Sequence, residues 1–527
     1  MSSSEIMPPL GDEHLIPPYI STYLESNNAP HDTDIEEIKH SLRVICQSLE
    51  KAGEDTNDRP RDIETSQKRR AALQETQSKL RSILSPLRRF PAEILSEIFQ
   101  HAVDRGYSPW ETSEGPWSLS HVSCHWRATA LTCSGVIWSK LYVGINIGRF
   151  DQKDHLSLLR TCLARSRSHN ILVDFDYQHP GSSYRDKAVE IIQLLIDNCE
   201  RWYFFEISNY CPEIYDLLGQ VRGHVPNLIY VEIIHGPVST AAPFTAFELA
   251  PKLRSVKMHS GFRVVVGPGN PSLISYEDYR RSPPSDPLES YSTILRPFHQ
   301  QLQKFTTLTV DTRSPEANSQ IIMPQLRHFR GSHRDLFQCV TAPNLETFHL
   351  DPVRRQSSAT KSLLGVLDLF IRSRCSGISK LALSNIVITT HILDILPLIP
   401  ALAVLRFQFS NWEGRSAEED IFRSMFRQMT DEDDVGELKA VPNLREFSFV
   451  VIQRHSWNNW YCSTLSFFDR IFLRMLASRV KTLKKVKVIG TIMNGMWYTE
   501  DESSFADLIK QGMDISGNDR RPWDFSM

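Results

Sequence analysis

The stretch PNLETFHL, from Pro343 to Leu350, shows a frame of residues that returns along much of the chain and indicates its architecture. It places apolar residues at Leu345, Phe348 and Leu350, which are positions 0, +3 and +5 of the frame. The last two positions alternate as in a short strand, and the leading leucine lies under the turn that the proline helps to make. Each such frame therefore predicts a turn followed by a short strand.

Nine frames fit this pattern and a tenth fits only in its first half. Those with a Pro-x-Leu prefix begin at Leu228, Leu253, Leu345, Leu402 and Leu444, and the half-matching one at Leu326. Frames without the proline begin at Trp202, Phe305, Ile378 and Leu483. Helical stretches such as AVEIIQLLIDNC, residues 188–199, lie between them. Several steps between frames measure about 20 to 29 residues, and the longer steps indicate insertions or degenerate repeats.

A strand, a turn and a helix repeated at this period are typical of a leucine-rich-repeat solenoid. The alternative is an ordinary α/β sheet with proline-rich turns, because the apolar pattern alone is weak. We therefore expect an α/β fold in which short N-terminal helices and a small helical module precede irregular leucine-rich repeats. The repeats should cover residues 146–500, and residues 501–527 should form a C-terminal tail.

The composition describes a globular protein without a strong charge preference. Of its 527 residues, 41% are hydrophobic and 10% aromatic, which is enough for a substantial core. The formal net charge is -3, so nothing attracts the whole chain to nucleic acid or to an anionic membrane. We expect neither as a partner.

The nine cysteines are scattered and form no C-x-x-C pair, which favours reduced thiols. The N-terminus, MSSSEIMPPLGDEH, shows no secretory signal. The most apolar long stretch, His391 to Phe407, contains Asp394, Pro397 and Pro400 and falls short of a membrane span. We expect a cytoplasmic or nuclear protein.

The N-terminal part should hold a flexible tail and then two helical segments. Residues 1–33 lack periodicity, whereas residues 34–84 contain two apolar seams separated by GEDTNDRPR at 53–61. The seams consist of Ile35, Ile38, Leu42, Ile45 and Leu49, and of Leu73, Leu80, Ile83 and Leu84. They predict either a helical hairpin or a single frayed helix, and the two coiled-coil heptads are too short for a stable dimer.

Residues 85–145 predict a bundle of short helices. In SPLRRFPAEILSEIFQ, Ser85 to Gln100, the proline suits a helix start, and Ile94, Leu95, Ile98 and Phe99 form one apolar stripe. A second helix should begin at Ser118 as its N-cap. Its apolar positions are Leu119, Val122, Trp126 and Ala130, and Ile137 and Trp138 extend them. Taken alone, the stripe belongs to the core of this module.

No constellation of residues predicts catalysis, a cofactor or a metal. GPGN at 267–270 lacks the Lys-Ser/Thr of a phosphate loop. His121, Cys124 and His125 could share a helix face, but no nearby group completes a tetrahedral site. The acidic run at 431–434 lacks the alternation of a calcium loop. We therefore expect a protein that is not an enzyme. Because a catalytic triad can assemble from residues far apart in the sequence, an unrecognised hydrolase in the C-terminal part is the alternative.

The helical module resembles the F-box. The residues are FPAEILSEIF at 90–99, then Leu119-x-x-Val122-Ser123-Cys124-His125-Trp126-Arg127 and Ile137-Trp138, against the family pattern L-P-x-E-I-L-x-x-I-F, V-C-x-x-W-R and L-W. Phe90 replaces the usual leucine, and the loop from Asp104 to Trp117 is longer than usual. With repeats downstream, the chain looks like the F-box proteins common in mushroom-forming fungi.

The resemblance implies binding to a Skp-type adaptor, and through it to a cullin-RING ubiquitin ligase. The implied adaptor-binding residues are Phe90, Pro91, Ile94, Leu95, Ile98, Phe99, Val122 and Trp126. Val122 and Trp126 either complete that surface or hold the helices together. The chain would then be a substrate-recognition subunit of an SCF-type ligase whose repeats bind an unknown target protein. The alternative is an F-box scaffold that acts without ubiquitination.

Three further segments bear on target binding. The pair Asn411-Trp412 and the segment SWNNW, with Trp457 and Trp460, are candidates for exposed aromatic contacts with a target. We expect instead that these tryptophans pack in the core or in a cap of the repeats. Residues 276–291, with SPPSDP, predict an inserted loop.

Overall fold

In the computed structural model, the chain is a mixed α/β protein with two compact units, Met1–Asp176 and Tyr177–Met527. The structure describes residues 18–26, 28–54, 60–104, 106–132, 135–145, 154–178, 184–236, 243–259, 263–268, 270–280, 295–308, 320–332, 334–351, 362–410, 412, 416–432, 434, 436, 438–451, 465–489 and 499–516. The expected α/β class is confirmed. Among the described residues, no helix is long and apolar enough to cross a membrane.

The first unit begins with α1 (Pro18–Ser26), α2 (Asp32–Glu54) and α3 (Pro60–Ile83). Helices α2 and α3 pack together as a hairpin, and the two seams meet in a core that consists of Ile20, Ile38, Ile45, Leu73, Leu80 and Ile83. The tail expected over residues 1–33 is therefore wrong for α1. Ile20 buries its side chain in the hairpin core, and that burial offsets the entropy lost when the segment orders.

The next elements are η2 (Pro86–Arg88), α4 (Ala92–Ala102), α5 (Gly115–His121), α6 (Cys124–Thr132) and η3 (Gly135–Trp138). The single helix expected from Ser118 is wrong, because α5 ends at His121 and a new helix starts at Cys124. The Ser123 hydroxyl caps that new helix by accepting the Trp126 N–H at 3.1 Å. Ser118 lies inside α5, where its hydroxyl donates to the Gly115 carbonyl.

The helical module is followed by β1 (Lys140–Gly144), and its core continues past residue 145 into α7 (His155–Arg165) and β2 (Ile171–Tyr177). Trp138 is fully buried, and the Arg165 guanidinium lies 4.5 Å from the centre of its ring. Strands β1 and β2 pair in parallel. The expected domain boundary at residue 145 is therefore wrong, because residues after it pack into the same core. A module of about 60 residues buries too little surface alone and needs these neighbours.

The second unit is built on parallel strands that lie side by side in sequence order. The strands are β3 (Trp202–Asn209), β4 (Tyr230–His235), β5 (Ser255–Met258), β6 (Ser275–Asp278), β7 (Lys304–Thr307), β9 (His328–Gly331), β11 (Thr347–Leu350), β12 (Lys380–Ser384), β13 (Val404–Phe409), β14 (Glu446–Val451), β15 (Lys485–Ile489) and β16 (Asp514–Ser516). A separate parallel pair consists of β8 (Ile321–Ile322) and β10 (Val340–Thr341).

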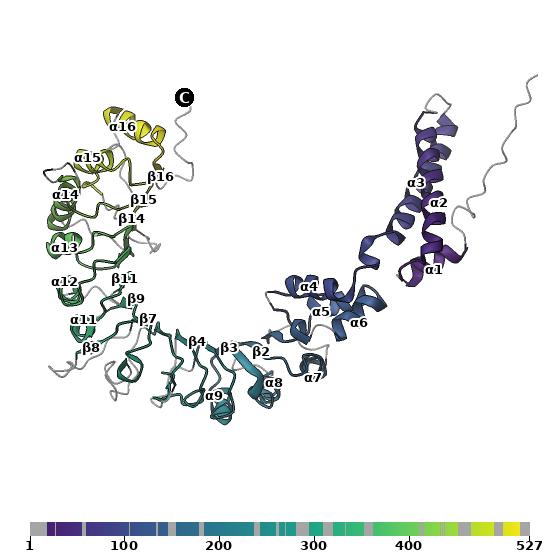
Figure 1. Ribbon diagram of the computed structural model, residues 1–527, viewed down its shortest axis with the longest axis horizontal. Coiled ribbons are helices and arrows are strands. Elements are labelled where there is room, and N and C mark those ends of the chain that lie inside the picture. Colours follow the sequence, from purple (N-terminus) through teal and green to yellow (C-terminus); the bar gives the residue numbers. More distant parts are fainter. Residues whose placement is uncertain are drawn as a thin grey trace, which may run out of the picture. The chain divides into compact units, whose positions relative to one another are not determined.

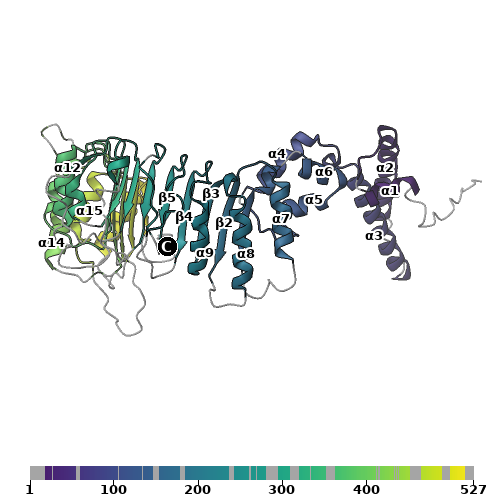
Figure 2. The same ribbon diagram turned by 90° about the horizontal axis from the view of Figure 1, so that it is seen from below.

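Helices connect many of these strands. They are α8 (Arg185–Ile196), α9 (Pro212–Leu218), α11 (Arg334–Cys339), α12 (Ser362–Ser373), α13 (His391–Ile395), α14 (Ser416–Thr430), α15 (Arg470–Ser478) and α16 (Thr499–Lys510), with 3-10 turns η4 (Cys199–Arg201), η5 (Gly219–Val221), η6 (Arg296–Phe298) and η8 (Leu396–Leu398). Figure 1 shows these helices along one side of the sheet, and Figure 2 shows the strands stacked beside one another. Among the residues that the structure describes, no helix covers the other side of the sheet, which we name its open side.

The repeated frames align across the sheet. Their +3 residues pair in register, so that Phe348 lies opposite Leu381, and Leu381 opposite Leu405. These side chains and the leading apolar residues are fully buried. The repetition in the sequence therefore reflects a continuous core under the sheet.

Two frames differ from the prediction. Phe305 pairs with Phe329, a +3 residue, so this frame begins at Leu302 and not at Phe305. Strand β6 carries a further Pro-x-Leu frame, Pro271-Ser272-Leu273, in the long step after Leu253. Its +5 residue is Asp278, which is buried in an ion pair with Arg280 at 2.6 Å, and the apolar pattern could not detect it.

Two expected boundaries also move. The tail expected at 501–527 is wrong for residues up to 516, because β16 pairs with β15 and Phe505 and Leu508 of α16 are buried. The loop expected from Tyr276 cannot begin there, since Tyr276 is buried in β6. Residues 281–291 of that loop lie outside the described residues.

Asparagine side chains tie successive repeats together. In the three Pro-Asn-Leu frames, Asn227, Asn344 and Asn443 donate from Nδ2 to a carbonyl of the preceding repeat. The acceptors are the carbonyls of Glu200, Pro324 and Pro400, at 3.0, 2.9 and 3.1 Å. Each acceptor stands two residues before the first position of the preceding frame. The asparagine thus satisfies a turn carbonyl that the sheet ladder does not use.

Candidate functional site

An apolar stripe runs along the outer side of α4 and the turn before it. It consists of Leu87, Pro91, Ile94 and Ile98, and we name it the α4 stripe. Ile94 and Ile98, four residues apart, lie on one face of α4, and Leu87 and Pro91 are exposed in the segment that leads into it. Ile94 is 49% exposed and Ile98 is 39% exposed, which is high for isoleucine. The α4 stripe is therefore available to another molecule.

The opposite side of α4 is buried inside the helical module. Leu95 and Phe99 have no exposed surface, so the expectation that they face an adaptor is wrong. The Phe99 ring lies 5.1 Å from the ring of Trp126 on α6. A helix only eleven residues long can hold its place only by burying one face, and these two side chains provide that face.

The other predicted residues divide between surface and core. Val122, at the end of α5, is exposed, while Phe90 and Trp126 are half-buried. The Phe90 carbonyl accepts a hydrogen bond from His125 Nε2 at 2.9 Å, which ties the start of α4 to α6. Val122 is thus a surface residue, whereas Trp126 packs against Phe99 and holds α6 to α4.

The entry to α4 is fixed by arginine. Arg88 donates from Nη1 to the carbonyls of Tyr23 and Asn28, at 2.6 and 3.0 Å, and burial lowers its pKa. Glu93 and Glu97 are exposed on α4 beside the stripe. The α4 stripe is thus a short apolar surface with acidic neighbours on a well-anchored helix. Such a surface is suited to docking, and full burial of each isoleucine is worth about 1.5–3 kcal/mol.

The candidate metal ligands do not assemble. His121, Cys124 and His125 are exposed, and in the described residues no group of three or more His, Cys, Asp or Glu side chains could hold a metal ion. The seven cysteines in the described ranges are free thiols.

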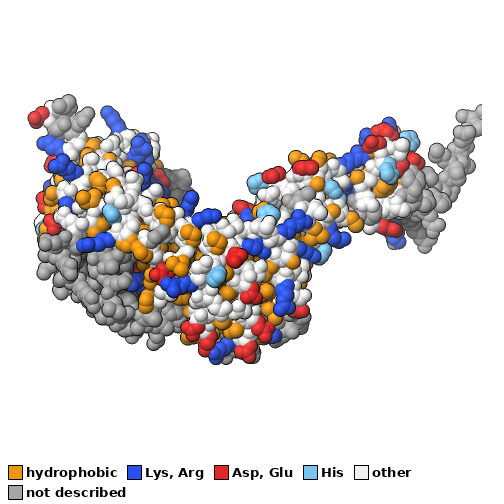
Figure 3. Space-filling view, turned by 60° about the horizontal axis from the view of Figure 1, so that its bottom comes forward, with side chains coloured by type: hydrophobic (Ala, Val, Ile, Leu, Met, Phe, Trp, Pro, Cys, Tyr) orange, Lys and Arg blue, Asp and Glu red, His pale blue; other side chains and the backbone are white. Residues whose placement is uncertain are grey.

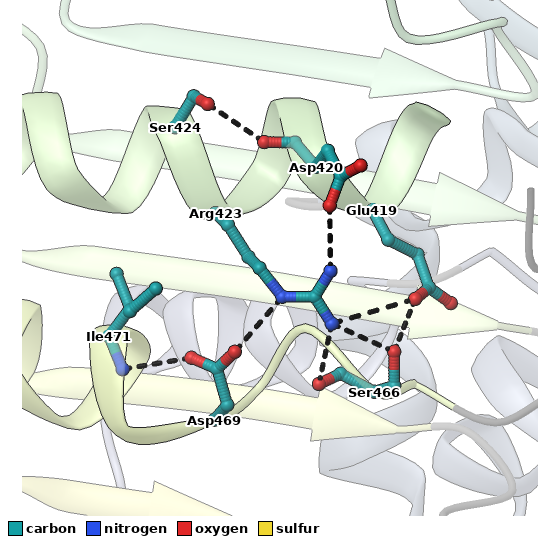
Figure 4. Close-up of polar contacts among 7 residues, drawn as sticks. All are labelled: Glu419, Asp420, Arg423, Ser424, Ser466, Asp469 and Ile471. Atoms are coloured by element: carbon teal, nitrogen blue, oxygen red, sulfur yellow. Dashed lines mark hydrogen bonds and ion pairs between the residues drawn. The ribbon is translucent and has the colours of Figure 1, made fainter. Parts of the chain in front are cut away.

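A polar cluster joins α14 to the start of α15 (Figure 4). Arg423 donates to Asp469 at 3.0 Å and to the Ser466 hydroxyl at 3.0 Å, and Ser466 also contacts Glu419. Asp469 in turn caps α15 by accepting the Ile471 N–H at 2.8 Å. These contacts of Arg423 and Glu419 join α14 to α15 or to the turn before it, so we interpret this cluster as a structural clasp.

The open side of the sheet carries a row of polar side chains that sequence reasoning missed. Register places the +4 residues of the frames opposite one another, and we name this set the central row. In strand order it is Glu206, Glu232, Lys257, Glu277, Thr306, Arg330, His349, Ala382, Arg406, Ser448, Lys487 and Ser516. The only signal in the sequence is that each residue lies between the two strand positions of its frame.

The acidic part of the central row has its own partners. Glu232 accepts from Lys257 Nζ at 2.7 Å and from His259 Nε2 at 2.8 Å. Burial opposes ionisation of Glu232, but these donors and Tyr230 prevail and lower its pKa to about 2. Glu277 is held in the same way by Lys304, at 2.8 Å. These carboxylates remain ionised under all physiological conditions.

His349 marks the more basic part of the row. Its Nε2 lies 2.8 Å from the Ser384 hydroxyl. Burial, aided by the positive charges of Arg330, Lys380 and Arg406, lowers its pKa to about 4. His349 is therefore neutral at pH 7.

Of the three tryptophans considered for target binding, the structure describes only Trp412. Trp412 is 2% exposed and packs 5.6 Å from Phe449, so it is a core residue. Trp457 and Trp460 lie outside the described residues.

Comparison with known proteins adds no name to these features. No protein-family model matches the chain, and no curated protein matches it.

Proposed function

We propose that this chain is a substrate receptor of an SCF-type ubiquitin ligase. An F-box in residues 85–145 would bind a Skp-type adaptor, and irregular leucine-rich repeats would bind the target protein. The observation that carries the proposal is the division of α4: Ile94 and Ile98 remain exposed while Leu95 and Phe99 are buried. The two isoleucines on one helix face, with Leu87 exposed before it, form an apolar surface that another protein can cover.

The repeat geometry supports the second half of the proposal. Parallel strands in sequence order, with frames in register and helices on one side, are what a leucine-rich-repeat domain requires. Such a domain presents the open side of its sheet to a partner. In this proposed function, the chain catalyses no reaction itself. It raises the effective concentration of the target beside the ligase.

The experiment is capture of a purified Skp-type adaptor by the full-length chain. Wild-type protein should retain the adaptor, and the double variant Ile94→Asp/Ile98→Asp should lose at least ten-fold of it. The matched control is Ile322→Asp/Ile371→Asp, which places the same charges at two exposed isoleucines of the second unit. Folded wild-type protein that captures no adaptor would refute the proposal.

The alternative is a scaffold that binds the adaptor without directing ubiquitination. A cullin recovered with the chain, together with a protein whose ubiquitination depends on Ile94 and Ile98, distinguishes the receptor from the scaffold. Adaptor capture without any such dependence favours the scaffold.

A further inference from the structure

The central row separates charge along the sheet. Its first four members are Glu206, Glu232, Lys257 and Glu277, so three of them are acidic. From β9 to β15 the row instead reads Arg330, His349, Ala382, Arg406, Ser448 and Lys487, and it contains no carboxylate. The net charge of -3 for the whole chain conceals this separation. On the face that Figure 3 shows, acidic and basic side chains are interspersed.

A neighbouring row adds cations to the same area. Its +2 residues include Lys380 on β12, Glu446 on β14 and Lys485 on β15. Asp351 stands at the end of β11 and pairs with Arg330 at 2.5 Å. Asp514 on β16 lies opposite Lys485 in the same register. Arg330, Lys380, Arg406, Lys485 and Lys487 thus face three carboxylates, Asp351, Glu446 and Asp514, which leaves two positive charges in excess. We name these five cations the basic patch.

Three members of the basic patch are not held by an ion pair, although Asp514 lies opposite Lys485 in the strand register. Lys380 and Lys485 are exposed, Lys487 is half-exposed, and none forms an ion pair with a described residue. Arg406 shares Glu446 at 3.2 Å and remains 41% exposed. The side chains between these cations are small and buried, at Ala382, Ser384 and Ser448.

The depressed pKa of His349 agrees with this charge balance. The cations that lower it are Arg330, Lys380 and Arg406, and Asp351 opposes them without cancelling their effect. The local field is thus positive even though carboxylates are present.

Resting on the proposed function, we propose that the basic patch binds an acidic, extended segment of the recruited protein. Five strand spacings separate Arg330 from Lys487, which is about 24 Å at about 4.8 Å per strand. An extended chain covers that length with about seven residues. The acidic members of the row on β3 to β6 repel such a segment, so it is confined to the β9–β15 part.

A polypeptide suits this surface better than nucleic acid. Single-stranded nucleic acid binds where aromatic side chains offer stacking platforms beside the cations. The residues of the two rows from β9 to β15 include no Phe, Tyr or Trp, and Glu446 and Asp351 would repel a regular line of phosphates. A peptide can place neutral residues opposite those two carboxylates.

The test measures fluorescence anisotropy of labelled nine-residue peptides with the full-length chain. One peptide carries four glutamates, and its counterpart carries four lysines at the same positions. We expect the acidic peptide to bind, the basic one not to bind, and the affinity to fall as salt is raised. The variant Lys380→Glu/Lys487→Glu should weaken binding at least five-fold.

The matched control is Arg296→Glu/Arg427→Glu, which makes the same charge change at exposed positions outside the strands and should bind as wild type does. Equal binding of both peptides, or unchanged binding by Lys380→Glu/Lys487→Glu, overturns the inference. Tighter binding of a nine-nucleotide single-stranded DNA overturns the choice of polypeptide. Adaptor capture is measured on the same preparations, so that loss of the proposed function is seen separately from loss of peptide binding.

Discussion

Phe99 of α4 and Trp126 of α6 pack with their ring centres 5.1 Å apart, and this contact determines which side of α4 faces outward. With Phe99 and Leu95 committed to the core, Ile94 and Ile98 are left at the surface. The apolar stripe that the sequence shows therefore divides into two buried and two exposed residues. The packing of α6 against α4 determines which residues are buried.

Phe99→Ala should lower the free energy of unfolding by about 3–5 kcal/mol, because it leaves a cavity under Trp126. Ile98→Ala should change it by less than about 0.5 kcal/mol, since Ile98 is already exposed. Urea unfolding of the full chain, followed by tryptophan fluorescence, measures both. Equal effects of the two substitutions would contradict the orientation of α4.

Asn443→Ala should destabilise the protein by about 1 kcal/mol, because the Pro400 carbonyl loses its donor. Gln325 is the matched control: it occupies the same place in a Pro-x-Leu frame, is exposed and makes no hydrogen bond with its side chain among the described residues. Gln325→Ala should therefore leave the melting temperature unchanged. A similar loss in both variants would mean that the asparagine acts through the turn and not through the bond.

Arg479→Met should destabilise the second unit by about 3 kcal/mol or more. Arg479 has no exposed surface, and its guanidinium donates to the carbonyls of Met429, Ala440 and Val441. Methionine fills much of the space but leaves three buried carbonyls without a donor. Arg427→Met, on the exposed side of α14, is the control and should stay within about 0.5 kcal/mol of wild type in thermal unfolding.

The stability of the chain should fall between pH 6.5 and pH 4 through His349. Its pKa is about 4 in the folded protein and about 6.5 when unfolded, so the unfolded chain binds more protons in this range. Lowering the pH therefore favours unfolding until pH 4, below which this contribution is constant. In His349→Gln the acid sensitivity over this range should be reduced, as judged by urea midpoints. A ring that titrates near 6.5 by NMR in the native protein would contradict the assignment.

Much of the repeat architecture was predictable, because apolar residues at 0, +3 and +5 can be recognised wherever all three are apolar. The frame at Leu273 escaped because Asp278 replaces the apolar residue and is neutralised by Arg280, a contact that no periodicity reveals. The frame at Phe305 was misplaced by three residues, since Leu302 and Phe305 are both buried and only strand pairing fixes the register.

Local sequence was enough to predict several elements: a helix that follows Pro91, the two seams of the hairpin and the succession of turns and strands. These depend on backbone preference and on local spacing. Tertiary structure decided which members of the α4 stripe remain exposed, where the strand register falls and which charges share a face. These depend on contacts between residues far apart in the chain. The basic patch is the plainest case, because Arg330 and Lys487 become members of one row only when five strand pairings bring their strands into one sheet.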